Sequence, residues 1–386
     1  MHILEIPSFF PPYGGLFCLD QAKALHSLGH EVRILSNVQL GVTKGLRHYF
    51  TLPTGRFEQQ MDGITVWQSY QRGIPRMVRY NMERWVGIVG SMFEQYIKRY
   101  GRPDVLHTHC AKWAGYAAML ISRQHGIPYI ITEHLPLMIL EEEFGKAPTN
   151  AWQVSLLREA YQEAGMVLPV SEELVRDTAC YYGNDYRWQY VSNTIDTNFF
   201  HYQSRKPRAG RAFRFCCLAD YQYRKGYDVL FLAFQKLQDC NADVELHIAG
   251  QQTNSAACSQ EIGRLHLQHV KAYGRIDKHH VRDLLYQCDA LILASRSEVQ
   301  PLVLLEAMST GIPVVCTECV PQCLRVEKGC LVVPVGDDVA LAAAMEKTMT
   351  TSADGHWLSE QAANLASPQV VGQKIEAILH TLLHTA

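Results

Sequence analysis

The sequence lacks three features that would each assign it to a broad class. No apolar run reaches the roughly 20 residues that a membrane-spanning helix needs. The N-terminus, MHILEIPSFF, has neither a basic region nor a small-residue cleavage site, so no signal peptide is predicted. The formal net charge of −2 provides no general attraction to nucleic acid. We therefore expect a cytoplasmic globular protein without a nucleic-acid partner.

A disulfide framework is also missing. The twelve cysteines are dispersed and mostly lie in apolar segments, which is typical of reduced thiols in a core. Four of them, Cys316, Cys319, Cys323 and Cys330, could together hold zinc or an iron–sulfur cluster. Their spacing matches no established ligand pattern, and Cys316 falls in an expected buried strand. We favour structural thiols over a metal site.

The length of the chain favours two domains. A single hydrophobic core rarely serves 386 residues, and strand and helix patterns alternate through both halves, as in α/β proteins. The segment QSRKPRAGR, 203–211, is polar and contains proline and glycine, which indicates a linker. We predict an N-terminal domain at 1–198, a linker at 199–211 and a C-terminal domain at 212–367.

The stretch Ser295–Cys316 gives the strongest functional signal. An apolar run at 290–294 predicts a buried strand before it. Pro301 suits the first position of a helix, where no N–H is needed, and apolar residues then recur at helical spacing until Gly311. A helix of about ten residues is therefore expected to begin at the carboxyl end of a strand.

Two glutamates bracket the start of this helix. Glu298 and Glu306 are separated by seven residues, which corresponds to roughly 12 Å along a helix. The unpaired N–H groups and partial positive charge of a helix N-terminus suit a phosphate. One acid would then lie at the sugar end of a nucleotide sugar, and the other would bind the ribose hydroxyls. The alternative is a pair of solvent-facing glutamates on a surface helix.

A second candidate for phosphate binding is the segment Tyr223–Gly226. Arg224 and Lys225 lie there between an expected strand and an expected helix. Adjacent cations in a strand-end loop fit a pyrophosphate, which a lysine can hold as a point charge. The alternative is a solvated turn.

Strand ends in the first half contribute further candidates. Gly14 and Gly15 follow the first strand, where glycine lets a backbone approach a phosphate or sugar closely. His134 follows the strand Tyr129–Thr132, where a side chain faces a ligand and the imidazole pKa suits proton traffic. The alternatives are a plain turn and a structural histidine, since the chain has seventeen histidines.

Together these motifs resemble the retaining glycosyltransferases of family 4, which have the two-domain GT-B fold. The clearest match is E-x7-E-A-M-x-x-G-x-P-V-V at 298–315. Other matches, in family order, are P-x-x-G-G before L-x-x-x-G-H-E-V, D-x-x-H-x-H, T-x-H, V-x-N-x-I-D and K-G-x-D-x-L. The resemblance implies two Rossmann-like domains with a deep interdomain cleft, and a C-terminal segment, 368–386, that joins the first domain.

The resemblance also implies a set of site residues. Catalytic roles would fall to His134, Lys225 and Glu298. Donor binding would fall to Gly14, Gly15, Asn193, Arg224, Lys225, Ile276, Glu298, Gln300, Leu302, Val303 and Glu306.

No metal or other cofactor is expected at this site. His107 and His109, in the D-x-x-H-x-H motif, are interpreted as structural or supporting residues. They are not interpreted as metal ligands, because no third ligand stands nearby in the sequence.

Three positions depart from the family pattern. Val299-Gln300-Pro301 stands where the family has Gly-Phe-Gly, and the proline removes an amide donor. Thr194 replaces the glycine that follows Asn193 in the family. Ala219 stands where the family has its first arginine, and Arg224 is the nearest residue that could compensate.

The segment Arg72–Arg102 combines basic and aromatic residues and predicts a long amphipathic helix. One interpretation is an interfacial helix that contacts anionic lipid or a lipid-linked acceptor. The other is a core-packed helix with a solvated basic face, which we favour because its apolar positions are neither unusually large nor many. Peripheral association with the inner membrane surface stays open.

The prediction is a retaining transferase that moves a sugar from a UDP- or GDP-sugar to a glycan or lipid-linked acceptor, in envelope polysaccharide or glycolipid synthesis. Two alternatives are kept. A sugar-nucleotide epimerase of related fold would react without an acceptor. An inactive nucleotide-sugar binder would agree with the missing arginine at position 219.

Overall fold

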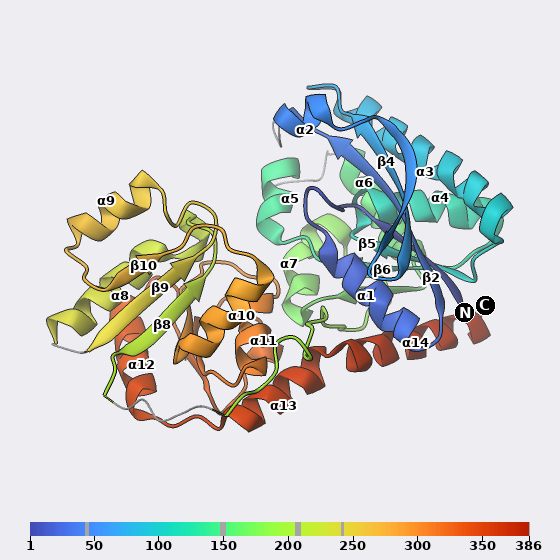
Figure 1. Ribbon diagram of the computed structural model, residues 1–386. Coiled ribbons are helices and arrows are strands. Elements are labelled where there is room, and N and C mark those ends of the chain that lie inside the picture. The colour runs from blue at the N-terminus through green and yellow to red at the C-terminus, as the bar shows by residue number, and fades with distance from the viewer. Residues whose placement is uncertain (43–45, 147–151, 205–209, 241–242, 386) are drawn as a thin grey trace. The chain divides into compact units, whose positions relative to one another are not determined.

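The computed structural model describes residues 1–42, 46–146, 152–204, 210–240 and 243–385 (Figure 1). The chain divides into two compact units, Met1–Thr194 with Pro368–Ala386 (unit 1) and Ile195–Ser367 (unit 2). The sequence placed the division at 198 instead. Ile195 already belongs to unit 2, because its N–H donates to the Ala366 carbonyl at 2.9 Å. Within the predicted linker, residues 205–209 lie outside the described part of the chain.

Unit 1 is built on a seven-stranded sheet in the order β3-β4-β2-β1-β5-β6-β7. Neighbouring strands are parallel except for β3, which runs antiparallel to β4. The strands are β1 His2–Pro7, β2 Glu31–Leu40, β3 Gly55–Met61, β4 Ile64–Arg72, β5 Val105–His109, β6 Tyr129–Glu133 and β7 Met166–Pro169.

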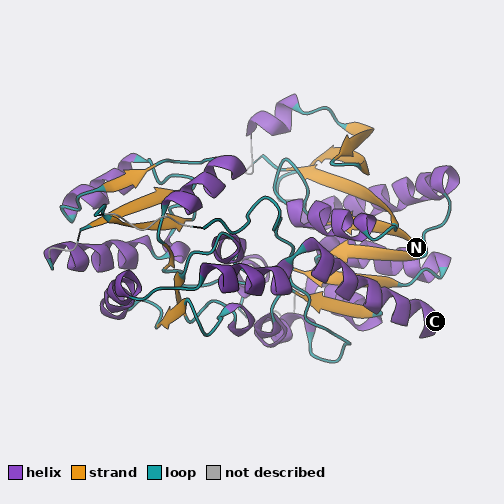
Figure 2. Cartoon of the chain, turned by 60° about the horizontal axis from the view of Figure 1, so that its bottom comes forward, coloured by secondary structure: helices purple, strands orange, loops and turns teal. Residues whose placement is uncertain are grey.

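Helices cover both faces of this sheet, as Figure 2 shows. Successive side chains of a strand point to opposite faces, so Ile3 packs with α1 and α14 while Leu4 packs with α3 and α4. The helices are α1 Leu16–Ser27, α2 Leu46–Thr51, α3 Val78–Tyr100, α4 Tyr116–His125, α5 Leu137–Phe144, α6 Trp152–Glu163, α7 Glu172–Tyr182 and α14 Pro368–Thr385. None of the helices in the described residues is both long enough and apolar enough to span a bilayer.

The burial of helix α3 distinguishes between the two interpretations of Arg72–Arg102 for most of this segment. It buries one face in the core of unit 1, where Trp85, Val89, Phe93 and Tyr96 are at most 3% exposed. The core-packed interpretation is therefore confirmed for this part of the helix. The start of the segment is different, since residues 74–80, which lead into α3 and form its first turn, are all exposed.

Unit 2 is built on a six-stranded parallel sheet in the order β10-β9-β8-β11-β12-β13. Its strands are β8 Phe213–Leu218, β9 Val244–Ala249, β10 Val270–Ala272, β11 Ala290–Leu293, β12 Val314–Thr317 and β13 Cys330–Val333. Its helices are α8 Tyr227–Asp239, α9 Ala256–Arg264, α10 Lys278–Gln287, α11 Leu302–Ser309, α12 Asp338–Thr350 and α13 Gly355–Ala366.

The core of unit 2 again lies on both faces of its sheet. Phe215 and Cys217 of β8 pack with α8 and α12, while Cys216 between them packs with α10, α11 and α13. Each unit is thus a parallel sheet with helices on both sides, which confirms the predicted α/β class.

The strand order determines where functional side chains can gather. In unit 1, β1, β5 and β6 are neighbours, so their carboxyl ends at Pro7, His109 and Glu133 lie at one edge of the sheet. In unit 2, β8 and β11 are neighbours, so the loops that follow them can touch.

Candidate functional site

The loops after β8 and β11 meet in unit 2, and each contributes a charged side chain. Lys225 Nζ lies 2.6 Å from Glu298 Oε1, and Ser295 Oγ donates to the same oxygen at 2.7 Å. The Glu298 side chain is 6% exposed and that of Lys225 is 16% exposed. The structure therefore brings together two site residues that the sequence predicted separately, and it points neither of them into open solvent.

Arg224 is hydrogen-bonded to the loop that carries Glu298. Its Nη1 donates to the Ser297 carbonyl at 3.1 Å and lies 3.7 Å from Glu298 Oε2. Its own carbonyl accepts from the N–H of Arg296 at 2.8 Å. Two cations, Arg224 and Lys225, thus lie against one buried carboxylate.

Gly226 is required by this contact. Its φ of +66° lies in the left-handed region, and a Cβ at this position would lie 1.9 Å from the Ala294 carbonyl oxygen. Any side chain at 226 would push the two loops apart. The Lys-Gly sequence therefore has a structural reason as well as a chemical one.

The helix α11 begins directly after this cluster. Pro301 is its N-cap and not its first helical residue, so the helix covers eight residues, Leu302–Ser309, where about ten were expected. The N–H groups of Leu302 and Val303 have no partner within the helix by its geometry. Glu306 lies on the same helix and is partly buried.

The other predicted donor-binding residues of unit 2 belong to the same core region or to the loop before this helix. Ile276, Leu302 and Val303 are partly buried and pack against the same core cluster, and Gln300 is also partly buried. Asn193 belongs to unit 1, where it is 6% exposed, and lies beside the division between the units.

In unit 1, Gly15 holds the loop after β1 tightly folded. It caps α1 with a φ of +85°, and a Cβ here would lie 1.9 Å from the Phe9 carbonyl oxygen. Gly14 before it also has a positive φ, of +97°. Two residues after Gly15, the ring of Phe17 lies 3.9 Å from that of His134. The glycine loop and the predicted histidine are therefore neighbours.

His134 is the end of a buried chain of hydrogen bonds. Glu5 Oε2 lies 2.8 Å from His109 Nε2, and His109 Nδ1 lies 3.2 Å from His134 Nε2. The other oxygen of Glu5 lies 3.0 Å from His107 Nδ1. Glu5, His107 and His109 are all fully buried. Burial would raise the pKa of Glu5, but the charge and hydrogen bonds of His107 and His109 hold it near 2.

This chain fixes the tautomer of His134. Burial lowers the pKa of His109 below its ordinary 6.5. Burial, and after it the charges of the neighbouring histidines, lower the pKa of His134 well below 6.5. Both rings are therefore neutral at pH 7. An ionised Glu5 only accepts, so His109 donates from Nε2 and its Nδ1 must accept from His134 Nε2–H. Nδ1 of His134 is then an acceptor, and it is buried without a hydrogen-bond partner among the described residues.

Glu133 positions the backbone that carries His134. Its Oε1 accepts from the N–H groups of His134 and Leu135, both at 2.9 Å. Its Oε2 accepts from Ala111 N–H at 3.0 Å and from the Tyr161 hydroxyl at 2.7 Å. A buried carboxylate with four donors fixes the turn after β6.

Sequence reasoning missed Glu5 and Glu133. The available signal was a charged residue inside an otherwise apolar strand, since Glu5 interrupts Ile3–Ile6. A charge at such a position is rarely buried unless it is paired. Its partners, more than 100 positions away, were visible only in the fold.

Among the described residues, Glu5, His107 and His109 are also the one group of three or more potential metal ligands whose ligating atoms lie within 4.8 Å of one another. The sequence argument against a metal was the lack of a third ligand, and β1 supplies one. Both carboxylate oxygens, however, already accept from the imidazoles. Cys316, Cys319, Cys323 and Cys330 form no such group there, although Cys316 and Cys330 are 3.5 Å apart.

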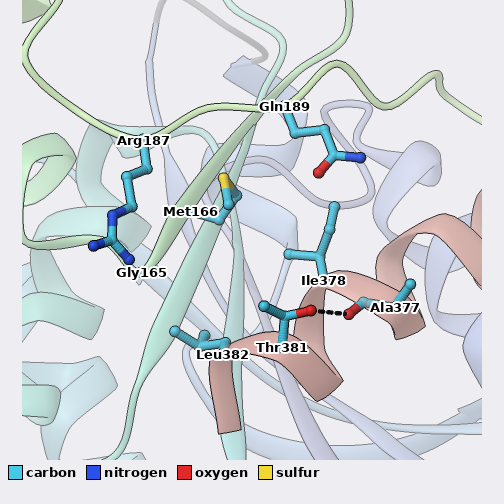
Figure 3. A pocket seen from close by; sticks show the side chains of 8 residues that line it. All are labelled: Gly165, Met166, Arg187, Gln189, Ala377, Ile378, Thr381 and Leu382. Atoms are coloured by element: carbon cyan, nitrogen blue, oxygen red, sulfur yellow. Dashed lines mark hydrogen bonds between the residues drawn. The ribbon is translucent and has the colours of Figure 1, made fainter. Parts of the chain in front are cut away.

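A cavity of about 170 Å³ lies elsewhere in unit 1, between the start of β7 and α14 (Figure 3). Its lining includes Met166, Gln189 and Ile378, and Arg187 extends beside it. Parallel α/β sheets bind ligands at the carboxyl ends of their strands, and this cavity lies at an amino end. None of the predicted site residues lines it.

Comparison with known proteins agrees with this arrangement. The family described as "Glycosyl transferase 4-like domain" matches residues 15–194, and the family "Glycosyl transferases group 1" matches residues 212–351. A Bacillus subtilis protein named for a glycosyltransferase of teichuronic acid biosynthesis is 25% identical over 332 residues, covering 82% of this chain and 81% of that protein.

Solved structures share the whole fold. Sucrose-phosphate synthase from Thermosynechococcus elongatus superposes with a TM-score of 0.77 at 16% identity, over 100% of both chains. Anabaena HepE, solved with UDP and glucose, has a TM-score of 0.73 at 19% identity, over 99% of this chain and 100% of its own. The two family matches together cover most of both units, and this chain belongs to the group 1 glycosyltransferases and has the GT-B fold.

Proposed function

We propose that this glycosyltransferase moves a sugar from a UDP- or GDP-sugar to a hydroxyl of a glycan or lipid-linked acceptor, with retention at the anomeric carbon. The proposed pathway is envelope polysaccharide or glycolipid synthesis. The observation that carries the proposal is the cluster of Lys225, Glu298 and Ser295 at the start of α11. The name of the Bacillus subtilis relative and the UDP held by HepE support the pathway and the donor.

In this proposal, the residues of unit 2 stabilise the leaving nucleotide. Negative charge develops on the phosphate as the glycosidic bond breaks, and Lys225, Arg224 and the first N–H groups of α11 offset it. Lys225 and Glu298 neutralise each other at 2.6 Å, so a diphosphate would compete with Glu298 for the lysine. Glu298 would then be available to orient hydroxyls of the sugar, and Glu306 to bind the ribose.

The residues of unit 1 would act on the transferred sugar. His134 presents an unprotonated Nδ1, which can accept a hydrogen bond from a sugar hydroxyl. Gly14 and Gly15 would allow a close approach of the backbone. No enzymatic nucleophile is assigned, because in a front-face reaction the leaving phosphate itself accepts the proton of the acceptor hydroxyl. These cations supply the positive charge, so the proposal needs no metal.

Nucleotide release tests the proposal. The purified chain is incubated with UDP-, GDP- and ADP-sugars, with EDTA present, and free nucleotide is measured with and without a panel of glycan and lipid-linked acceptors. Release with one donor that rises strongly when an acceptor is added, and an α-linked product from an α-linked donor, are expected.

Other results would support the alternatives. Conversion of the donor sugar without an acceptor would indicate an epimerase. Donor binding without turnover across the panel would indicate an inactive binder, as Ala219 in place of the family arginine allows. A linkage of inverted configuration would contradict retention alone.

A further inference from the structure

Two short segments of unit 1 expose large apolar side chains together. Helix α2 has no buried residue, and residues 74–80, which lead into α3 and form its first turn, are exposed throughout. Of the fourteen large hydrophobic residues exposed in the described chain, six belong to these segments, with exposures between 40% and 67%. They are Leu46, Phe50, Ile74, Met77, Val78 and Tyr80. Single exposed apolar residues are ordinary, but a group of this kind marks an interaction surface.

Arginines alternate with these apolar residues. Arg47 lies in α2, and Arg76 and Arg79 lie in the second segment, all exposed. No acidic residue occurs in 46–52 or in 71–82. Arg79 pairs with Glu83 at 2.9 Å, and no ion pair of Arg47 or Arg76 is formed in the described part of the chain. We call the six apolar residues and these three arginines the basic apolar surface.

Hydrogen bonds join helix α2 to the chain just before residues 74–80. Arg72 Nε donates to the Tyr49 carbonyl at 2.8 Å, and the Tyr49 hydroxyl donates to the Gly73 carbonyl at 3.3 Å. Asn81 holds the second segment from both sides, since it accepts from Ile74 N–H at 2.9 Å and donates to the Ile74 carbonyl at 2.7 Å. These bonds hold the two segments next to each other, and each segment exposes its apolar side chains from a fixed backbone.

The basic apolar surface adjoins the glycine loop of the candidate site. The ring of Tyr13, directly before Gly14, lies 5.9 Å from that of His48 in α2. A partner bound at this surface would thus lie beside the loop that is proposed to receive the sugar.

We propose that the basic apolar surface binds the face of a bilayer that contains anionic phospholipid. Leucine, phenylalanine and methionine side chains enter the boundary between headgroups and acyl chains, while arginines bind the phosphates around them. The excess of positive charge selects an anionic membrane over a neutral one, and over a second copy of the same basic surface. The surface places unit 1 on the membrane without crossing it.

Vesicle sedimentation with the full chain tests this proposal, independently of any transferase activity. The chain is expected to sediment with vesicles of phosphatidylcholine and phosphatidylglycerol, weakly with phosphatidylcholine alone, and less at high salt. Replacing Phe50, Met77 and Val78 by serine should lower the partition constant at least tenfold. Arg47→Gln and Arg76→Gln should lower it about fivefold each.

A matched control uses exposed apolar residues of unit 2. Leu232, Val335 and Val339 are 36%, 38% and 62% exposed, and their replacement by serine should leave the partition constant unchanged. A tryptophan in place of Phe50 should be quenched by brominated lipid, and one in place of Val339 should not. The proposal is overturned if the wild-type chain does not sediment with anionic vesicles, or if both triple variants sediment with them as the wild type does. It is also overturned if the wild-type chain is a dimer and the Phe50 triple variant is a monomer.

Discussion

At the scale of single residues, the candidate site consists of charged and polar side chains that pair with one another. Lys225, Arg224 and Ser295 all lie on the carboxylate of Glu298 or beside it. A pair that is largely shielded from water interacts more strongly than one on the surface. Removal of either partner is therefore expected to affect both ligand binding and the order of the loop.

We predict that Lys225→Ala lowers kcat at least 100-fold, because a fixed cation next to a developing phosphate charge contributes several kcal/mol to the transition state. Steady-state nucleotide release measures this loss. The matched control is Lys236→Ala in α8, since that lysine is 46% exposed and pairs with Asp338 at 3.3 Å away from the cluster. Equal rates for the wild type and Lys225→Ala would remove the lysine from the reaction.

We also predict that His134 carries its proton on Nε2. Nitrogen-15 NMR of labelled histidine should show an unprotonated Nδ1 in the wild-type chain, assigned by its disappearance in His134→Gln. His109→Leu removes the acceptor of that proton and should lower kcat by roughly fivefold to tenfold, the effect of one hydrogen bond. His109→Asn, whose oxygen can replace Nδ1, should restore most of the rate. A protonated Nδ1 in the wild type would disprove the chain of donors from Glu5.

At the scale of elements, the site depends on the contact between the loops after β8 and β11. This contact is made by backbone as much as by side chains, since Arg296 N–H bonds to the Arg224 carbonyl and Gly226 lies against Ala294. The neighbouring places of β8 and β11 in the sheet bring the loops together, and the glycine lets them touch.

Gly226→Ala should destabilise unit 2 by about 2 kcal/mol or more, because a left-handed φ and an overlap with a carbonyl oxygen both disfavour a side chain. Denaturant unfolding followed by circular dichroism measures the loss, and nucleotide affinity should fall with it. Gly263→Ala in α9 is the control. It has open space around its Cβ and should stabilise the helix by up to about 1 kcal/mol. Equal destabilisation by the two variants would contradict the argument.

At the scale of the whole molecule, the last helix returns to the first unit. Val371, Ile375 and Leu379 of α14 are fully buried in the core cluster that also holds Ile3 and Leu25. The stability of unit 1 therefore depends on both ends of the chain. It also depends on pH, because Glu5 and His109 are buried within it.

Unit 1 should lose stability as the pH falls. The folded state holds the pKa of Glu5 near 2, below its ordinary 4.5, so the stabilisation is complete above 4.5 and is lost between 4.5 and about 2. Burial lowers the pKa of His109 below 6.5, so the unfolded chain takes up that proton first and stability begins to fall below pH 6.5. The loss from Glu5 is on the order of 3 kcal/mol.

Urea unfolding between pH 7 and 3 measures this effect. Tryptophan fluorescence is the suitable signal, since five of the six tryptophans belong to unit 1. Glu5→Gln should flatten the acid part of the profile. Glu83→Gln, which removes an exposed carboxylate of the same unit, should leave the profile as it is. Identical profiles for the wild type and Glu5→Gln would show that Glu5 does not contribute.

Much of the fold could be predicted from local pattern. The strands predicted at 290–294 and Tyr129–Thr132 are β11 and β6, and each differs from its predicted bounds by one residue at the carboxyl end. Helix α11 was expected to begin at Pro301 and begins at Leu302, because a proline accepts the N-cap position equally well. The sequence predicted the end of the first domain at residue 198, four residues after the observed end at Thr194. The hydrogen bond from Ile195 to Ala366 joins residues far apart in the sequence, so no local pattern could predict it.

The sequence by itself determined the α/β class, the two sheets and the identity of Lys225, Glu298 and His134 as candidates, because periodicity, strand ends and motif spacing are local properties of a chain. Only the tertiary structure decided that Lys225 and Glu298 are partners, that Glu5 sets the tautomer of His134, and that two segments of unit 1 share one basic apolar surface. Those contacts join residues between 23 and 104 positions apart, and strand order rather than local pattern brings them together.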